Sequence, residues 1–451
     1  MARLLLSLSL TMLLSLIGMI RAQETCDSDS TLCSIHSSKI YGVNLGGWLV
    51  LEPWIRPSLF SQWEEVPASE QVVDEWTFTE RLGPREASKV LNRHWDEWVT
   101  EAEIEELAGY GINHVRIPLG YWALDIDPEE PYVSGALSYL LRAVRWAGKY
   151  GIKVFVELHA APGSQNGNDH SGRRGKINWV GNEDNVERTS RVVKQLAQVL
   201  SAPGIVEHLA GVGLINEPVL RNGTEVQDRV TLEAYYEVTY ERVRRHLPET
   251  PVVLDTAFQP LRSWETFMQE EEEEEEGEGE GEGKEGNHSL FMDTHLYQVF
   301  DAASLDLDLN GHMKAACDWS PELKRTLDYK PAIVGEWSLA MTDCAQWLNG
   351  FGRGSRWDGS LEGQASPTHQ GGSCKDKREE LVESPQNREA LRRFAQAQMT
   401  AYEAGAGWIF WNFKTEPGTP DWNFLQGVRQ GYIPKPNDPS RGDGCNLSRS
   451  F

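Results

Sequence analysis

Two glutamates stand directly after short apolar runs, a setting unlike that of an ordinary surface carboxylate. Glu217 lies in the string Asn216-Glu217-Pro218, and Glu336 follows the run 332–335. Taken alone, a glutamate at such a place is usually a solvated loop residue. A pair can share acid and base work, because a protonated carboxyl delivers a proton to a leaving oxygen while an ionised carboxylate faces the reacting carbon. The pair therefore predicts hydrolysis of an acetal, whose oxocarbenium-like transition state needs stabilisation from both sides.

Other polar residues suit these two roles. Arg116 and Tyr297 can donate hydrogen bonds to Glu336 and keep it ionised. Glu217 is then expected to be the carboxyl whose pKa is raised, so that it alternates between acid and base. Asn216 is placed to bind a sugar 2-hydroxyl in the transition state. A structural ion pair is the alternative interpretation of Arg116.

Two histidines and a tryptophan complete the candidate set. His159 and His295 are expected to orient the substrate or the carboxylates, and Trp411 offers a flat apolar face for a pyranose ring. Each also has a structural alternative, since either histidine could be hydrogen-bonded in the core and Trp411 could be core packing. Their occurrence beside the two glutamates favours the functional interpretation.

Eight apolar runs rich in β-branched residues recur along the chain, separated by helix-like segments. The predicted strands are Ile40–Val50, His114–Leu119, Lys153–His159, Gly211–Asn216, Pro251–Ala257, Leu290–Tyr297, Pro331–Trp337 and Gly407–Phe413. The clearest amphipathic segments are Ser138–Tyr150, Asn185–Leu200 and Ser384–Ala404, the last with Ser384 as its cap. Eight alternations predict a single (β/α)8 barrel of the TIM type, an α/β fold whose active site forms at the C-terminal strand ends. Glu217 and Glu336, on the fourth and seventh strands, then converge across the barrel mouth.

The N-terminus has the pattern of a signal peptide over residues 1–22. Arg3 precedes an apolar run from Leu4 to Ile20, and the small Ala22 follows. A membrane anchor is the alternative, but the run is short for a spanning helix and Arg21 follows it directly. We therefore expect a secreted protein, extracellular or in the cell wall, with no membrane association after cleavage and with residues 23–451 as the catalytic domain.

An acidic low-complexity segment, at about 269–287, interrupts the barrel pattern between the fifth and sixth predicted strands. Residues 270–285 hold eleven Glu and one Lys, which contribute −10 to the net charge of −25. Repeated Glu repels itself and Gly offers no core contact, so we expect a disordered loop insertion. The acidic balance also argues against nucleic acid as a partner.

Six cysteines fit an oxidising compartment, and three sequons suggest glycosylation of exposed loops. No CxxC pair or histidine cluster accompanies the cysteines, so neither a metal site nor a cofactor is expected. The cysteines are Cys26, Cys33, Cys317, Cys344, Cys374 and Cys445, and the sequons begin at Asn222, Asn287 and Asn446. Four cysteines in the last third allow three pairings.

Several longer strings resemble the family five glycoside hydrolases, and more narrowly the fungal exo-β-1,3-glucanases. LINEP (Leu214–Pro218) alone indicates only the wider clan. The more specific strings are GVNLGGWLVLEPWI (Gly42–Ile55), VELHAAPGSQNGNDHSG (Val156–Gly172) and VGEWSLAMTDCAQWLNG (Val334–Gly350). Further matches are NHVRIPLGYWA (Asn113–Ala123), DTHLYQVF (Asp293–Phe300) and GWIFWNFKTE (Gly407–Glu416).

The resemblance implies roles for individual residues. Glu217 corresponds to the acid/base and Glu336 to the nucleophile of a retaining enzyme. Glu52, Asp169 and Arg353 correspond to the residues that close one end of the cleft and hold a terminal glucose. The shell around the cleaved sugar corresponds to Arg116, His159, Asn216, His295, Tyr297 and Trp411. Disulfides between Cys317 and Cys445 and between Cys344 and Cys374 are implied in the same way.

One departure concerns the cleft entrance, where the resemblance implies an aromatic clamp with one ring from each of two loops. Phe300 matches one side, but Asn168 stands where the other ring is expected. Stacking in the next sugar subsite is then weaker, or it comes from another aromatic residue.

The expected function is an exo-acting enzyme that releases glucose from the non-reducing ends of β-1,3-glucan, in cell-wall glucan metabolism. The alternatives on the same scaffold are an endo-glucanase, a β-1,6-glucanase or a wall-remodelling transglycosylase. A non-catalytic wall-binding protein is a further alternative, against which the intact pair of glutamates counts. We expect a monomer that needs no cofactor, because two carboxylates and water suffice for this chemistry.

Overall fold

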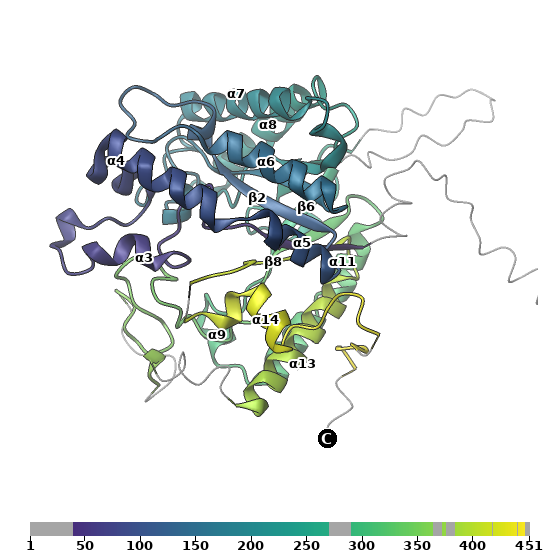
Figure 1. Cartoon of the computed structure of the whole chain (residues 1–451). Helices are drawn as coiled ribbons and strands as arrows, with labels where there is room; N and C mark the ends of the chain where they lie inside the picture. The colour runs from purple at the N-terminus through teal and green to yellow at the C-terminus, as the bar shows by residue number, and fades with distance from the viewer. Residues whose placement is uncertain are drawn as a thin grey trace, which may run out of the picture. The chain divides into compact units, whose positions relative to one another are not determined.

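Eight parallel strands close into a barrel in sequence order, which confirms the predicted (β/α)8 fold (Figure 1). Strand β1 pairs with both β2 and β8 and so closes the sheet. The strands are β1 (Ile40–Asn44), β2 (His114–Gly120), β3 (Lys153–Ala160), β4 (Leu209–Gly213), β5 (Val252–Asp255), β6 (Leu290–His295), β7 (Ala332–Glu336) and β8 (Gly407–Phe410). The computed structural model describes residues 39–269, 290–363, 372–375, 384–416, 418–439 and 441–446.

Some of the predicted features lie outside the described residues. They are the signal peptide 1–22, the cysteines Cys26 and Cys33, residues 270–287 of the acidic insertion and the sequon at Asn287. Within the described residues, no helix is long and apolar enough to cross a membrane.

Several strands are shorter than predicted at their C-terminal ends. The first was expected to reach Val50, but β1 ends at Asn44 and the buried apolar residues that follow form turns. The fourth was expected at Gly211–Asn216, but β4 ends at Gly213. An apolar run indicates that a segment is buried, not that it is a strand. In a barrel the chain stays buried after it leaves the sheet, where it forms the loops at the barrel mouth. The residues beyond each strand are therefore the ones that form the site.

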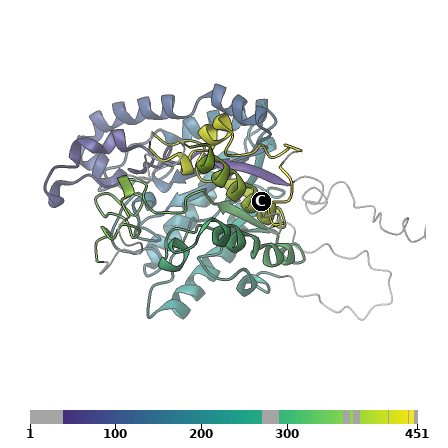
Figure 2. The ribbon, with the colours of Figure 1, turned by 90° about the horizontal axis from the view of Figure 1, so that it is seen from below.

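The helices lie outside the barrel strands, as Figures 1 and 2 show. The three predicted helices are confirmed as α6 (Ala136–Lys149), α7 (Glu183–Leu200) and α13 (Pro385–Tyr402). Ser384 caps α13, because its hydroxyl oxygen accepts the backbone N–H of Asn387 at 3.0 Å. Further α-helices are α3 (Pro57–Phe60), α4 (Glu75–Trp98), α5 (Glu101–Gly109), α8 (Glu225–Arg244), α9 (Ala302–Leu305), α10 (Leu309–Cys317), α11 (Ser320–Thr326) and α14 (Phe424–Gln430).

Two disulfides hold segments around the barrel, and both have the pairing that the family resemblance implied. Cys317, the last residue of α10, is bonded to Cys445 and ties the C-terminal segment to the helical layer. Cys344 is bonded to Cys374 within the long connection between β7 and α13. The C-terminal segment also pairs with the barrel mouth, since the Leu339 N–H donates to the carbonyl of Asp421 at 3.0 Å.

Candidate active site

A cavity of about 590 Å³ opens at the C-terminal ends of the strands, where the barrel fold predicts the active site. Ten of the twelve predicted site residues line it: Glu52, His159, Asp169, Glu217, His295, Tyr297, Phe300, Glu336, Arg353 and Trp411. Arg116 and Asn216 do not line the cavity and instead contact residues that do. The structure therefore brings most of the predicted residues together at the barrel mouth, and their roles at this site stay predictions.

The two glutamates converge as expected from strands four and seven. One carboxylate oxygen of Glu217, one of Glu336 and a ring nitrogen of His295 all lie within 4.8 Å of one another. Carboxyl groups about 5–5.5 Å apart are typical of glycosidases in which the second carboxylate attacks the sugar directly. The spacing leaves little room for a water molecule between carboxylate and sugar, so the geometry suits a covalent intermediate.

Glu336, the last residue of β7, receives a hydrogen bond on each carboxylate oxygen. The Arg116 guanidinium donates to Oε1 at 2.9 Å, and the Tyr297 hydroxyl donates to Oε2 at 2.8 Å. Both donors favour the charged form, as predicted. Burial is nevertheless the largest influence and raises the pKa of Glu336 above its usual value. The two donors hold the carboxylate in place for attack and offset part of the cost of burying its charge.

Arg116 connects Glu336 to the neighbouring strands. Its guanidinium donates to the side-chain oxygens of Asn44 and Asn216 at 2.9 and 2.7 Å and lies 3.2 Å from Glu157. The contact fixes the Asn216 amide so that its oxygen is occupied. The amide nitrogen of Asn216 is buried and has no hydrogen-bond partner among the described residues. The Asn216 amide is thus a buried donor without a partner among the described residues, and its binding of a sugar hydroxyl stays a prediction.

Glu217 follows β4 in an unusual backbone conformation. Its φ is +45°, in the left-handed region that non-glycine residues rarely adopt. The Glu217 N–H donates to Asp255 Oδ2 at 2.9 Å, and Asp255 ends β5. Such a conformation persists only where surrounding contacts determine it. Asp255 thus helps to aim the Glu217 side chain into the cavity, a role that the sequence analysis missed although the residue ends a predicted strand.

The pKa values of the pair differ from the predicted order. His295 Nδ1 lies 2.7 Å from Glu217 Oε1. Burial opposes ionisation of Glu217, but the hydrogen bond and charge of His295 outweigh it and lower the pKa of Glu217 to about 2. Burial likewise opposes a charged His295, yet the carboxylates of Glu336 and Asp293 raise the pKa of His295 well above its usual value. The prediction of a raised pKa for Glu217 is therefore wrong, because His295 holds a proton more tightly than Glu217 does.

One side of the cavity holds polar groups suited to sugar hydroxyls. Glu52 is buried and accepts the indole N–H of Trp54 at 3.1 Å, while Asp169 has one buried carboxylate oxygen with no partner among the described residues. Burial, and then the nearby charge of Asp169, raises the pKa of Glu52 well above its usual value. Trp411 is stacked against His159 with 5.6 Å between ring centroids. Polar groups and a flat ring together fit a pyranose.

The entrance has aromatic side chains from two different loops. Phe300, after β6, is 42% exposed and packs edge-on against Tyr297, 5.5 Å between centroids. Asn168 lines the cavity without a ring, as the sequence showed. Phe258, after β5, is 61% exposed and lines the same cavity. The sequence analysis missed Phe258, although an aromatic residue just past a predicted strand end was a usable signal.

His170 is a third residue that the sequence analysis missed. Its Nε2 lies 3.6 Å from Glu217 Oε2, the carboxylate oxygen that does not face His295. Burial lowers the pKa of His170, so this ring is neutral at neutral pH. His170 directly follows Asp169, and that adjacency was the available signal. The acid/base candidate thus has a different histidine beside each of its oxygens.

A barrel with paired glutamates at strands four and seven defines the protein as a glycoside hydrolase. Residues 83–350 match the cellulase model of glycosyl hydrolase family 5, and the chain belongs to that family. The chain is 42% identical to the glucan 1,3-beta-glucosidase of Blumeria graminis, over 89% of this chain and 88% of the relative. It is 38% identical to the glucan 1,3-beta-glucosidase of Pichia angusta, over 89% of this chain and 87% of the relative.

A solved structure agrees with the fold. The rutinosidase from Aspergillus niger superimposes with a TM-score of 0.65 at 21% identity, covering 87% of this chain and 97% of the other. At that identity the likeness concerns the barrel alone.

Proposed function

We propose that the protein is a secreted, retaining exo-β-1,3-glucanase that releases glucose from the non-reducing ends of β-glucan. The observation that carries the proposal is the pair Glu217 and Glu336, whose oxygens lie within 4.8 Å of His295 and of each other in a cavity lined by sugar-binding groups. The relatives named glucan 1,3-beta-glucosidase support the choice of glucan and linkage.

In the first step, Glu336 attacks the anomeric carbon while the leaving oxygen takes a proton from Glu217. Arg116 and Tyr297 hold the Glu336 oxygens, so the nucleophile is oriented before substrate arrives. Binding of a sugar displaces water around Glu217 and His295, and the proton they share across 2.7 Å becomes available to the leaving oxygen. The products of this step are the released glucan and a glucosyl ester on Glu336.

In the second step, water attacks the same carbon from the side that the leaving group vacated. Glu217, now ionised, takes a proton from that water, and the C–O bond to Glu336 breaks. Two inversions at one carbon retain the β-configuration. Asn216 supports both transition states through the amide nitrogen that it keeps free of protein partners among the described residues.

The residues that line the cavity support the exo mode. Glu52, Asp169 and Arg353 line it together with Trp411, so polar and charged groups surround the position of one terminal sugar. Carboxylates and a guanidinium bind paired hydroxyls well. A glucan chain that continued beyond this subsite would collide with these side chains, so only the end of a glucan chain fits.

Secretion and a role in the cell wall are part of the proposal. The two disulfides are typical of an oxidising compartment. Asn222 and Asn446, which begin two sequons, are both exposed and are proposed sites of glycosylation. We also propose that the enzyme acts as a monomer on cell-wall glucan.

The test is a time course on laminarin, pustulan and cellulose, with all products resolved and the anomer of the first product read by proton NMR. We expect glucose as the main early product from laminarin, initially in the β-form. Early oligosaccharides would indicate an endo-glucanase, faster cleavage of pustulan a β-1,6-glucanase, and products longer than the substrate a transglycosylase. An initial α-anomer would overturn the retaining mechanism.

A further inference from the structure

The connection between β7 and α13 forms one wall of the active-site cavity. Asn349, Gly350, Arg353 and Glu362 all line the cavity from this segment. The Arg353 side chain is exposed to the cavity, and its guanidinium has no carboxylate partner in the described part of the chain. Its position must therefore come from the backbone that carries it. That backbone is fixed on both sides, since the Arg353 N–H donates to Gly350 and its carbonyl accepts the N–H of Glu362 at 3.0 Å.

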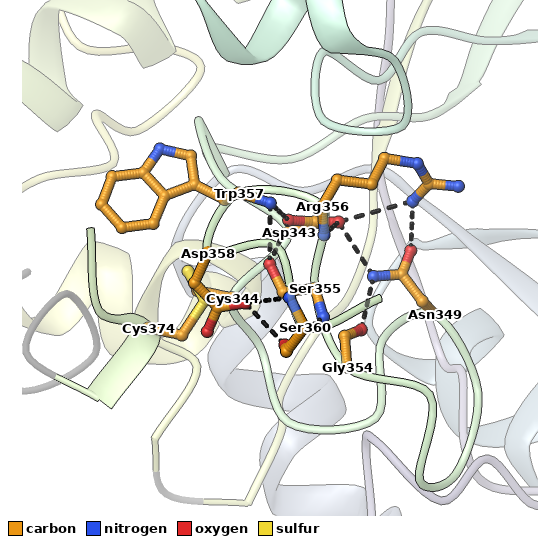
Figure 3. Close-up of a disulfide and its surroundings, with 10 residues drawn as sticks. All are labelled: Asp343, Cys344, Asn349, Gly354, Ser355, Arg356, Trp357, Asp358, Ser360 and Cys374. Atoms are coloured by element: carbon orange, nitrogen blue, oxygen red, sulfur yellow. Dashed lines mark hydrogen bonds and ion pairs between the residues drawn. A yellow bond between two sulfur atoms is a disulfide. The ribbon is translucent and has the colours of Figure 1, made fainter. Parts of the chain in front are cut away.

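A single buried carboxylate organises this wall (Figure 3). Asp343 has no exposed surface, and its oxygens accept hydrogen bonds from residues on both sides of Arg353. Oδ2 accepts from the Asn349 side-chain amide at 2.9 Å and from the Arg356 N–H at 2.8 Å. Oδ1 accepts the Trp357 N–H at 3.0 Å and the Ser355 hydroxyl. The contacts close residues 349–357 into a compact turn.

The residue next to Asp343 anchors the same turn covalently. Cys344 is bonded to Cys374, and both cysteines are buried (Figure 3). On the other side, the Arg174 guanidinium donates to the carbonyl of Phe351 at 3.0 Å. Arg174 also lines the cavity, so this bond joins the wall to the loop that carries Asp169. The cavity wall is thus held by the disulfide within its own connection and by the Arg174 contact from the loop that carries Asp169.

We propose that Asp343 is a positioning residue that sets the place of Arg353 in the terminal-sugar subsite and so determines how tightly a chain end is held. The proposal rests on the proposed function, because it concerns the same subsite. Asp343 itself does not line the cavity and touches no substrate. It acts because five donors converge on one carboxylate, the Arg356 guanidinium at 3.4 Å among them, and an amide in its place would turn its own N–H groups toward those donors.

The experiment measures inhibition by glucose, which fills only the terminal-sugar subsite, together with KM and kcat for laminaribiose. Asp343→Asn is expected to raise the Ki of glucose and the KM about tenfold while kcat changes less than about threefold. Arg353→Ala should show a similar rise. The double variant should be no worse than Arg353→Ala alone, because coupled residues are not additive.

Asp358→Asn is the matched control. Asp358 lies on the same segment and accepts the N–H of Ser360 at 3.0 Å, but it does not line the cavity. We expect its Ki and KM to stay within about twofold of the unmodified enzyme. Multiplying effects in the double variant, or an unchanged Ki in folded Asp343→Asn, would overturn the role of Asp343.

If Asp343→Asn does not fold, Ser355→Ala provides the second variant. It removes one donor to Asp343 without placing an amide in the turn. A rise of about two- to fivefold in the Ki of glucose supports the proposal, and an unchanged Ki contradicts it. The outcomes also separate the two proposals. If the unmodified enzyme releases no glucose from laminarin, the exo-glucanase function is wrong. If the enzyme is active but the variant has an unchanged Ki for glucose, only the role of Asp343 is wrong.

Discussion

At the scale of single residues, the two glutamates differ through their neighbours. Glu336 faces a guanidinium and a phenol that both donate hydrogen bonds, whereas Glu217 faces histidines on both oxygens. Only Glu217 has a histidine beside each of its oxygens, and a histidine side chain can hold a proton and return it. The assignment of nucleophile and acid/base therefore rests on contacts from β2, β6 and the loop after β3.

The two roles predict different defects in matched glutamine variants. With a β-glucoside of an activated phenol, which leaves without a proton, Glu217→Gln should still release phenol in a rapid first burst. Glu336→Gln should show no burst and should lose at least about a thousandfold in kcat, because an amide does not attack the sugar.

Stopped-flow absorbance of the phenol distinguishes the two cases. Bursts in both variants, or full activity of Glu336→Gln, would contradict the assigned mechanism. Near-UV circular dichroism of each variant checks that the buried carboxyl was replaced without loss of the fold.

The proton shared by Glu217 and His295 predicts a shift in the pH profile. Activity requires that the pair hold one proton, and it is lost as pH rises through the pKa that His295 has in this pair. That pKa is raised well above its usual value, so the basic limb of kcat/KM should lie above about pH 6.5. Without His295, the proton must stay on Glu217, which holds it less tightly.

In His295→Gln we therefore expect the basic limb to move to lower pH. The acidic limb, set by ionisation of Glu336, should move to higher pH, because the charge of His295, 3.5 Å away, lowers the pKa of Glu336. The measurement is kcat/KM for laminaribiose against pH. A basic limb that stayed fixed or moved upward would show that the pair does not hold the catalytic proton.

At the scale of elements, strands and loops differ in how much of them the sequence could predict. All eight strands were predicted because β-branched apolar runs mark buried strands at any place in the chain. Their C-terminal bounds were wrong at β1, β4 and β8, since the chain remains apolar and buried as it leaves the sheet. Polar residues at strand ends still marked the site, because a parallel barrel brings all these ends to one face.

Loop residues were harder to predict, because their contacts depend on the path of the chain. His170 and Phe258 enter the cavity from loops whose geometry no periodic pattern specifies. No sequence pattern marks Asp343, because its hydrogen-bond partners, as far along the chain as Trp357, are brought to it by the path of an irregular turn. A positioning role of this kind depends on the three-dimensional path of the loop and is not encoded in a local sequence pattern.

The position of Phe258 predicts that its removal lowers activity only on longer substrates. Its exposed ring lines the cavity from the loop after β5 and can stack on a sugar beyond the cleaved bond. Phe258→Ala should lower kcat/KM for laminaritriose about twofold to twelvefold, because one such contact contributes about 0.5–1.5 kcal/mol.

Activity on an aryl β-glucoside, which lacks that sugar, should stay within about twofold in the same variant. Val226→Ala on α8 is the control, because Val226 is 83% exposed and does not line the cavity. Equal losses on both substrates would mean that Phe258 maintains the loop and does not bind a sugar.

At the scale of the whole molecule, the two disulfides in the described part of the chain hold different kinds of structure. The Cys317–Cys445 bond joins residues 128 apart and ties the C-terminal segment to α10, away from the cavity. The Cys344–Cys374 bond joins residues 30 apart within the connection that forms the cavity wall. A longer closed loop restricts the unfolded chain more, so the first bond should contribute more to stability.

Paired serine variants should separate stability from binding. Cys317→Ser with Cys445→Ser should lower the free energy of unfolding by about 2–4 kcal/mol and leave KM for laminaribiose unchanged. Cys344→Ser with Cys374→Ser should lose less stability, because it releases a shorter loop, yet it should raise KM by loosening the wall around Arg353. Urea unfolding followed by tryptophan fluorescence gives the first quantity and steady-state kinetics the second. If both pairs of variants changed stability and KM in the same proportion, the wall would be part of the general fold and would have no separate role in holding the chain end.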